Sequence, residues 1–211
     1  IIQAAFEITD TLGFECVTIR AIANRLGTST APIYTQYDNI EAIYADLSTY
    51  VNEKLIEGTK VRRTRDSFLD IGVGMLSFAL EHKLVFTNFY LSTDRPPFDF
   101  RRYENEFVAQ MKRNSFLGLL EDERLRSILC DMWVFTYGIA TMICTGIETS
   151  PELMYYQNML EQTGNRIITY HILSSGKFEM YIHKIFESCQ EINDVKEALP
   201  HENLNGQRHP R

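Results

Sequence analysis

The stretch Ile22-Ala-Asn-Arg-Leu-Gly-Thr-Ser-Thr-Ala-Pro-Ile-Tyr-Thr-Gln-Tyr37 places two short helical patterns on either side of Gly27, and its only charged residue is Arg25. A helix-turn-helix needs a small residue facing the partner helix, a turn residue that accepts a left-handed backbone, and a buried aliphatic anchor on the second helix. Ala23, Gly27 and Ile33 meet these three requirements. The stretch therefore predicts two helices that cross at a tight turn.

The second of these helices carries polar and aromatic residues with hardly any charge. Thr30, Tyr34, Thr35 and Gln36 are expected to project outward, away from the buried Ile33. Short polar and aromatic side chains suit a helix that reads base edges once phosphate contacts have set its position. The residues that hold the two helices together are structural whatever the function, so only the outward residues argue for DNA.

Helical periodicity extends in both directions from this stretch. An apolar pattern over residues 1–12 ends at Gly13, and Thr18 is placed to cap the helix that follows. The third helix is expected to begin near Ser29 or Thr30, and the fourth after a cap at Asp38 or Asn39. The buried stripe of the fourth helix is expected to consist of Ile43, Leu47, Val51 and Leu55.

The remainder of the chain has helical spacing and almost no alternation of period two, which predicts an all-α fold. Asp94-Arg-Pro-Pro97 is expected to break the helices, and Ser150-Pro151 to start one. The tail from Leu199 to Arg211 has no periodicity and is expected to be disordered. Six longer helices are expected at about 65–81, 83–92, 100–117, 121–147, 150–173 and 177–191.

Composition limits the class of protein. The chain has 211 residues, 45% of them hydrophobic, which suits one or two globular domains with a real core. The four cysteines, Cys16, Cys130, Cys144 and Cys189, lie far apart with no metal-binding spacing, which fits a reducing cytoplasm. The longest run without charge, from Met132 to Ile147, is shorter than the about 20 apolar residues of a membrane span, so we expect a buried helix and no membrane partner.

The N-terminal quarter of the chain holds a run of motifs that is more specific than a bare helix-turn-helix. The run consists of Ala4-Ala-Phe6, Gly13-Phe14, Val17-Thr18-Ile19-Arg20, Ile22-Ala23, Leu26-Gly27-Thr28-Ser29, Ile33-Tyr34, Tyr37 and Asn39-Ile40-Glu41. In these residues the chain resembles the TetR-like transcriptional regulators. A second, weaker likeness, to the long subunit-interface helix of such regulators, lies in Met132-Trp133, Tyr137-Gly138-Ile139-Ala140 and Gly146.

The resemblance implies an all-helical homodimer that binds a double-stranded DNA operator and is released by a small-molecule effector. It implies a three-helix DNA-binding head at residues 1–38, a connecting helix at 39–57, and a ligand-binding and dimerising body at 58–192, followed by a disordered tail at 193–211. Thr18 and Tyr34 match phosphate contacts, and Arg20 matches a residue that can reach a base. The DNA-binding residues implied in this way are Thr18, Arg20, Ser29, Thr30, Ala31, Pro32, Tyr34, Thr35, Gln36 and Tyr37.

The head departs from the family in its charge. The family usually has a phosphate-binding lysine at the start of the fourth helix, where this chain has Ile40. Residues 1–57 hold three basic and eight acidic side chains, a balance of minus five, whereas DNA-binding faces are normally basic. Affinity for DNA is then expected to depend on a basic arm before Ile1, and the alternative is a helical protein-interaction adaptor with a degenerate DNA-binding head.

The body is expected to hold a mostly apolar pocket for the effector, although large apolar residues are more often plain core. Neither a catalytic constellation nor a phosphate loop is found, so the chain is not expected to be an enzyme. The five histidines form no metal-binding pattern, and no cofactor is expected. The residues expected to line the pocket are Met75, Phe78, Phe86, Phe89, Phe107, Met111, Trp133 and Tyr137.

Overall fold

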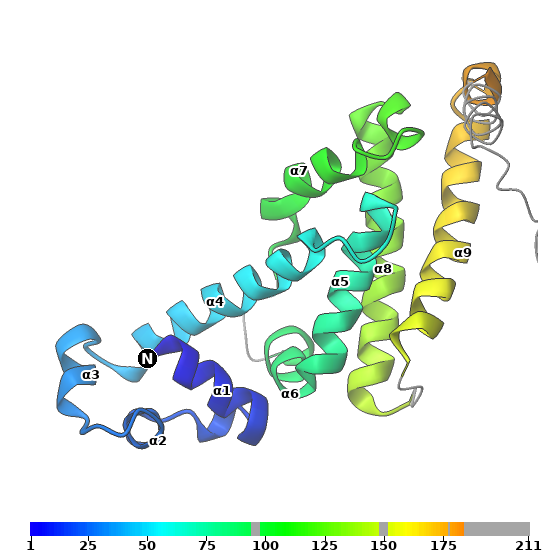
Figure 1. Ribbon diagram of the computed structural model, residues 1–211. Coiled ribbons are helices and arrows are strands. Elements are labelled where there is room, and N and C mark those ends of the chain that lie inside the picture. The colour runs from blue at the N-terminus through cyan, green and yellow to red at the C-terminus, as the bar shows by residue number, and fades with distance from the viewer. Residues whose placement is uncertain (94–97, 148–151, 177, 184–211) are drawn as a thin grey trace, which may run out of the picture. The chain divides into compact units, whose positions relative to one another are not determined.

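The structure is a computed structural model that describes residues 1–93, 98–147, 152–176 and 178–183. Within these ranges every regular element is a helix and no strand occurs, which confirms the all-α prediction. The described chain forms two compact units, one from Ile1 to Thr169 and one beginning at Tyr170. The first unit holds both the N-terminal helices and the body that follows them (Figure 1).

Three short helices form the N-terminal head: α1 (Ile2–Leu12), α2 (Ile19–Arg25) and α3 (Ala31–Gln36). Gly13 ends α1 with φ of 93°, a left-handed value that favours glycine, as the sequence predicts. The Thr18 hydroxyl oxygen accepts a hydrogen bond from the backbone N–H of Ala21 (3.1 Å) and caps α2, which confirms its predicted role.

The turn between α2 and α3 has the geometry that the opening stretch predicts. Gly27 has φ of 64°, and Ile22, Ala23 and Ile33 are buried between the helices. Thr30 is the residue before α3, and Pro32 lies in its first turn, where the missing N–H costs no helical hydrogen bond. The head therefore holds its two short helices together through a few small and aliphatic residues.

Helix α4 (Ile40–Lys60) leads from the head to the body (Figure 1). Its cap is Asn39, whose side-chain oxygen accepts the backbone N–H of Ala42 at 2.9 Å. The four residues of the predicted stripe are all buried: Ile43, Leu47, Val51 and Leu55. One face of α4 is thus apolar from Ile43 to Leu55.

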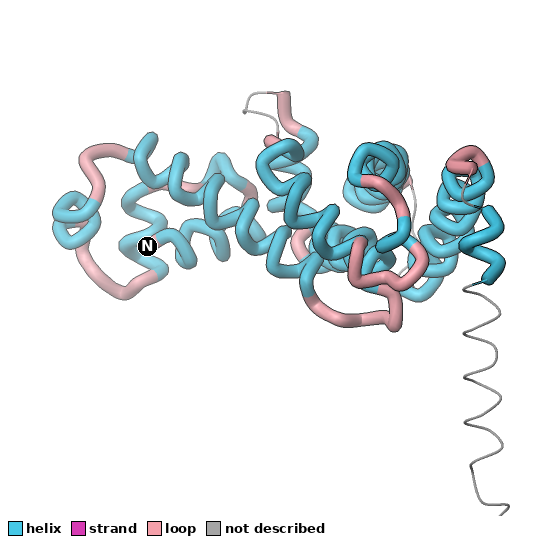
Figure 2. The backbone as a smooth tube through the Cα atoms, turned by 90° about the horizontal axis from the view of Figure 1, so that it is seen from above, coloured by secondary structure: helices cyan, strands magenta, loops and turns pink. Residues whose placement is uncertain are grey.

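The body is built around α5 (Ser67–Glu81), which packs against both α4 and α8 (Asp122–Thr145). The other body elements are α6 (Lys83–Phe86), a π-helical turn at Thr87–Leu91, α7 (Phe100–Met111), a short 3₁₀ turn at Leu117–Leu119, and α9 (Leu153–Leu173). Figure 2 shows the described part of the chain as helices joined by loops.

Two glycines allow α4 and α5 to cross closely. A Cβ atom on Gly74 would lie 2.4 Å from the carbonyl oxygen of Gly58, far inside van der Waals contact. Gly74 is therefore required by the close approach of the two backbones.

Two of the predicted helices differ from the structure. The helix expected at 83–92 is only four residues of α-helix followed by the π-helical turn, and the helix expected at 100–117 ends at Met111. The Asn114 side chain accepts the backbone N–H groups of Phe116 (2.9 Å) and Leu117 (3.1 Å), and such a local turn competes with helix continuation.

Several expectations fall on residues that the structure does not describe. They are the break at residues 94–97, the helix start at 150–151, the end of the 177–191 helix and the disordered tail at 193–211, which all lie outside the described residues. In the second unit, residues 178–183 are helical. Helix α8 is long and apolar enough to cross a membrane by length and composition alone, a test that the core helix of a soluble protein also passes.

Candidate nucleic-acid interface and ligand pocket

In helix α3, the residue that packs against the head and the residues that could contact DNA bases lie on different faces. Ile33 is 1% exposed, whereas Tyr34 is 56% exposed, and Thr35 and Gln36 are exposed beside it. The Thr35 hydroxyl donates to the carbonyl oxygen of Ala31 (3.1 Å), which leaves its methyl group and oxygen lone pairs outward. Ala31 and Pro32 are also exposed, so α3 presents a continuous polar and aromatic surface of low charge.

The residues before α3 are less uniform. Ser29 is exposed and Thr30 half-buried, and Thr30 makes no side-chain cap to α3. Thr18 is exposed although it caps α2, so its hydroxyl proton is available to a phosphate oxygen. Arg20 is exposed on α2 and forms no ion pair with another described residue.

Tyr37 differs from the other candidate DNA-binding residues because its hydroxyl is engaged. It donates to the Asp46 carboxylate of α4 at 2.9 Å, and the ring is half-buried. Burial, followed by the hydrogen bond and charge of Asp46, raises the pKa of the Tyr37 phenol. Tyr37 thus ties the end of α3 to α4, a positioning role that its place in the sequence did not reveal.

Positive charge is scarce on the head. Arg25 forms an ion pair with Glu7 of α1, with 2.9 Å between Arg25 Nη2 and Glu7 Oε2, so part of its charge is neutralised. Ile40, at the position where the family usually has lysine, is half-buried. Arg20 is therefore the basic side chain of α2 and α3 that is not paired within the described residues.

The head contacts the body at a second place besides α4. His82 Nδ1 lies 2.9 Å from Asp10 Oδ2 of α1, and the His82 ring packs edge-on against Phe6. Phe14, just after α1, packs against Phe89 of the π-helical turn with ring centroids 5.7 Å apart. The position of α1 is thus coupled to the body segment that follows α5.

The body contains a cavity of about 90 Å³ between α5, α8 and α9. Of the eight predicted pocket residues, Met75 and Trp133 line it. Its full lining is Asp66, Phe68, Leu69, Ile71, Gly72, Met75, Leu129, Met132, Trp133, Thr136, Leu160, Glu161, Gly164, Asn165 and Ile168.

The structure places the other six predicted pocket residues away from the lining of this cavity. Phe86, Phe89, Phe107 and Met111 are buried in the body core, and Phe78 is also buried. Tyr137 is half-buried, and its hydroxyl donates to the carbonyl oxygen of Tyr90. These side chains pack against one another, because large apolar residues on adjoining helices fill the space between them.

Trp133 connects this aromatic core to the cavity. Its ring stacks on Phe98 at 5.4 Å between centroids, and it also contacts Phe100 and Phe107 of α7. Phe98 in turn stacks on Tyr103 at 5.5 Å. A ligand against Trp133 would therefore touch the same ring that packs on α7.

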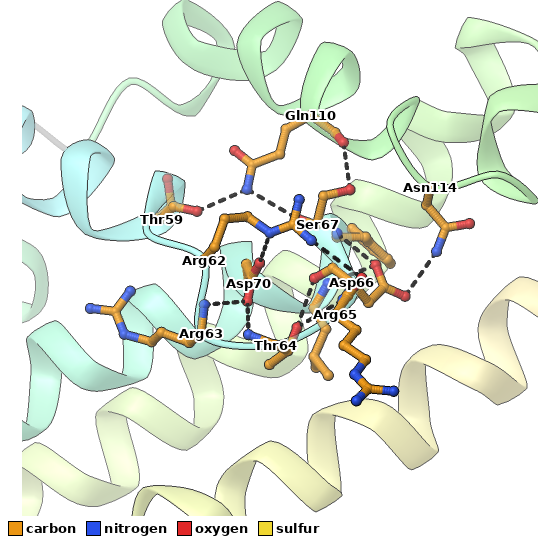
Figure 3. Close-up of polar contacts among 12 residues, drawn as sticks. Thr59, Arg62, Arg63, Thr64, Arg65, Asp66, Ser67, Asp70, Gln110 and Asn114 are labelled. Carbon is orange, nitrogen blue, oxygen red and sulfur yellow. Dashed lines mark hydrogen bonds and ion pairs between the residues drawn. The ribbon is translucent and has the colours of Figure 1, made fainter. Parts of the chain in front are cut away.

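The joint between α4 and α5 contains a buried hydrogen-bond network centred on Gln110 of α7 (Figure 3). The side-chain Nε2 of Gln110 donates to the backbone carbonyl oxygens of Thr59 (2.8 Å) and Ser67 (2.9 Å). The Ser67 hydroxyl donates to the backbone carbonyl oxygen of Gln110 (2.9 Å). Gln110 is 6% exposed, so these bonds are shielded from water. One side chain thus joins the end of α4 and the start of α5 to α7.

Two carboxylates complete this joint. Asp70 is buried: its Oδ1 accepts the backbone N–H groups of Arg63 (3.0 Å) and Thr64 (2.7 Å), while Oδ2 lies 3.0 Å from Arg62 Nε, at ion-pair distance but not aligned for a hydrogen bond. Asp66 Oδ1 accepts the backbone N–H of Phe68 and caps α5. Because Asp66 also lines the cavity, the cavity wall and the joint share the first turn of α5.

Comparison with known proteins bears on the head. Residues 1–47 match the family described as bacterial regulatory proteins, tetR family. The N-terminal part of the chain is therefore similar to the DNA-binding region of TetR-family regulators. The match covers α1, α2, α3 and the beginning of α4, and it supports a DNA-binding helix-turn-helix head and a role of the chain in transcription regulation. No curated protein and no solved structure matches the chain.

The sequence did not reveal several residues that line the cavity, nor those that build the α4–α5 joint. Gly72 and Gly164 face the cavity from α5 and α9, and a Cβ on Gly72 would lie 3.0 Å from the Leu160 side chain. Gln110 and Asp70 are polar residues within apolar helical patterns. A polar residue at such a position was the only sign in the sequence of a buried hydrogen-bond network. No group of three His, Cys, Asp or Glu side chains in the described part of the chain is placed to hold a metal ion.

Proposed function

We propose that the chain is a homodimeric repressor that binds a near-palindromic operator and is released by a small, mostly apolar ligand. The observation that carries the proposal is the exposed, weakly charged face of α3 opposite the buried Ile33, in a TetR-family head. Base reading is assigned to Thr35 and Gln36, and phosphate binding to Thr18 and Tyr34, with Arg20 reaching a base. Repressors of this kind act on DNA in the cytoplasm and carry out no catalysis.

The proposed dimer interface lies on the exposed side of α8. Val134 is 68% exposed and Met142 is 40% exposed, with the exposed Gly138 midway between them. Residues four apart lie on the same face of a helix, so these three form one stripe. Met154 on α9 is also exposed, and exposed apolar side chains of this kind are typical of protein interfaces.

The dimer is tested by sedimentation. Wild-type protein is expected to sediment as a dimer at micromolar concentration, whereas Val134→Glu and Met142→Glu are expected to give monomers. Val61→Glu is the matched control, because Val61 is also an exposed apolar residue but lies after α4, away from the stripe. A wild-type monomer would contradict the proposal.

In the proposed dimer, the two α3 helices lie about 34 Å apart, or a somewhat longer groove-matched distance, in successive major grooves. A ligand changes operator affinity only by its differential affinity for the two head spacings, and typical couplings of about 1 to 3 kcal/mol correspond to roughly 5- to 150-fold changes. The route proposed for this coupling is the first turn of α5, since it lines the cavity through Asp66 and is bonded to the end of α4 through Gln110.

DNA binding is tested by selection from a random duplex pool followed by gel shifts over a range of salt concentrations. A repressor is expected to enrich a near-palindromic site, with affinity that falls as salt rises. The acidic balance of residues 1–57 and Ile40 favour a second candidate, a partner-binding protein with a degenerate head. Failure to enrich any duplex sequence would favour that candidate.

A further inference from the structure

The polar groups around the cavity are mainly hydrogen-bond acceptors. Two carboxylates, those of Asp66 and Glu161, line it, and so do the Thr136 hydroxyl and the Asn165 amide. Among its described lining residues there is no lysine, arginine or histidine. The cavity therefore carries negative charge that no basic side chain in its wall offsets.

Glu161 is the more accessible of the two carboxylates, because it is exposed whereas Asp66 is half-buried. It lies on α9 and makes no hydrogen bond or ion pair with another described residue. Its ionised carboxylate can only accept hydrogen bonds. A ligand that offers a donor or a positive charge would thus gain a partner at Glu161 without displacing an existing one.

Asp66 is an acceptor whose position is fixed. Besides capping α5, its Oδ2 accepts a hydrogen bond from Asn114 Nδ2 at 2.9 Å, yet it has no ion pair with a described cation. The start of α5 offsets part of its charge, because helix N-termini carry partial positive charge. We therefore expect Asp66 to contribute less than Glu161 to the attraction of a cation.

The neutral lining points the same way. The Thr136 hydroxyl donates its proton to the carbonyl oxygen of Met132 (2.7 Å). Towards the cavity, this hydroxyl can therefore only accept a hydrogen bond. Trp133 contributes an aromatic ring to the wall, against which an apolar group can pack. The other walls are apolar side chains of α5, α8 and α9, which suit an aromatic or aliphatic body.

We propose that the cavity binds a small amphipathic amine, whose apolar body lies among Met75, Leu129 and Trp133 and whose protonated amino group lies near Glu161 and Asp66. The proposal rests on the proposed function in taking this cavity as the effector site, and it goes further by naming the chemical class of the effector. Carboxylate ligands of the same size are expected to bind more weakly, because the same charges repel them.

The test uses three probes that share one apolar body: phenethylamine, phenethyl alcohol and phenylacetate. Trp133 is the single tryptophan of the chain, so its fluorescence reports binding in the cavity directly. Titrations at neutral pH and low salt are expected to give an affinity for phenethylamine roughly tenfold higher than for phenylacetate, with the alcohol between them.

Substitutions locate the selectivity. Glu161→Gln is expected to weaken phenethylamine binding by at least about threefold and to leave the alcohol unchanged. Asp66→Asn is expected to have a smaller effect in the same direction, and it preserves the α5 cap because asparagine caps helices as well as aspartate does. Glu123→Gln is the matched control, since Glu123 is exposed on α8 and does not line the cavity.

Three results would overturn the proposal: phenylacetate or the alcohol binding as tightly as the amine, an amine preference unchanged in both cavity variants, or no binding of any probe. The measurement needs no DNA, so it fails independently of the proposed function. If amines bind without changing operator affinity, the proposed ligand class is supported and the proposed release of the operator by a ligand is rejected. If only carboxylates release the operator, the release is supported and the proposed ligand class is rejected.

Discussion

The head and the body use their residues in different ways. In the head, structural and candidate reading residues lie on opposite faces of the same short helix, with Ile33 buried and Gln36 exposed. In the body, cavity and core residues alternate on the same faces of α5 and α8, as Met75 and Phe78 do. The difference implies that head function is separable from head stability, whereas cavity changes in the body also affect its packing.

The largest expected effect is on the body. Gly74→Val places side-chain atoms where the Gly58 carbonyl of α4 lies, so the two backbones must separate. We expect a loss of about 3 kcal/mol or more in the free energy of unfolding, measured by urea denaturation. Gly58→Ala is the control: its added Cβ would lie 3.7 Å from the Gly74 carbonyl oxygen, an ordinary van der Waals contact, and alanine favours helix by up to about 1 kcal/mol. Equal stability of the two variants would refute the close α4–α5 crossing.

The next effect concerns the joint that connects the two regions. Gln110→Met keeps the side-chain volume but removes the donor to Thr59 and Ser67, leaving buried carbonyl oxygens without that partner. We expect a loss of about 2 kcal/mol in the free energy of unfolding. Gln162→Met, at an exposed position of α9, should change it by less than about 0.5 kcal/mol. If both variants are equally stable, the network does not hold the joint.

The contrast between head and body also explains what the sequence could predict. The ends of the head helices could be predicted from the sequence, because they depend on local backbone geometry that neighbouring residues determine. The residues that act in this way are Gly13, Thr18, Gly27 and Asn39. The apolar stripe of α4 was likewise readable, because burial on one side of a helix leaves a periodic pattern.

The cavity was much less predictable. Phe107 and Trp133 are both large aromatic residues within helical patterns, so the sequence does not distinguish a core residue from a cavity residue. The packing of α7 against α8 decides that Trp133 lines the cavity and that Phe107 is buried in the core. The joint depends on Gln110 meeting residues 43 and 51 positions away in the chain. Such long-range contacts leave no periodic signal, and composition favours no particular pairing.

A third prediction separates reading from stability within the head. Gln36→Ala is expected to relax sequence preference at one base pair, with a loss of about 1 to 3 kcal/mol in operator binding, whereas Tyr34→Phe should weaken all duplexes alike. Both residues are exposed, so the unfolding free energy should stay within about 0.5 kcal/mol of wild type. Gel shifts with the selected site and single-base variants measure this. Unchanged preference in Gln36→Ala would show that α3 enters the groove in another register.

The smallest expected effect tests why so acidic a head can bind DNA. Glu7→Gln frees Arg25 from its exposed ion pair, which costs the fold little because such pairs contribute at most about 1 kcal/mol. The released guanidinium, in the last turn of α2, can then neutralise a phosphate, so DNA affinity should rise modestly and the slope of log affinity against log salt should steepen by about 1. Glu53→Gln makes the same change of charge on the exposed side of α4 and should leave the slope unchanged. If both variants steepen the slope equally, overall charge governs binding; if neither does, Arg25 lies away from the DNA and the head depends on Arg20 and neutral contacts.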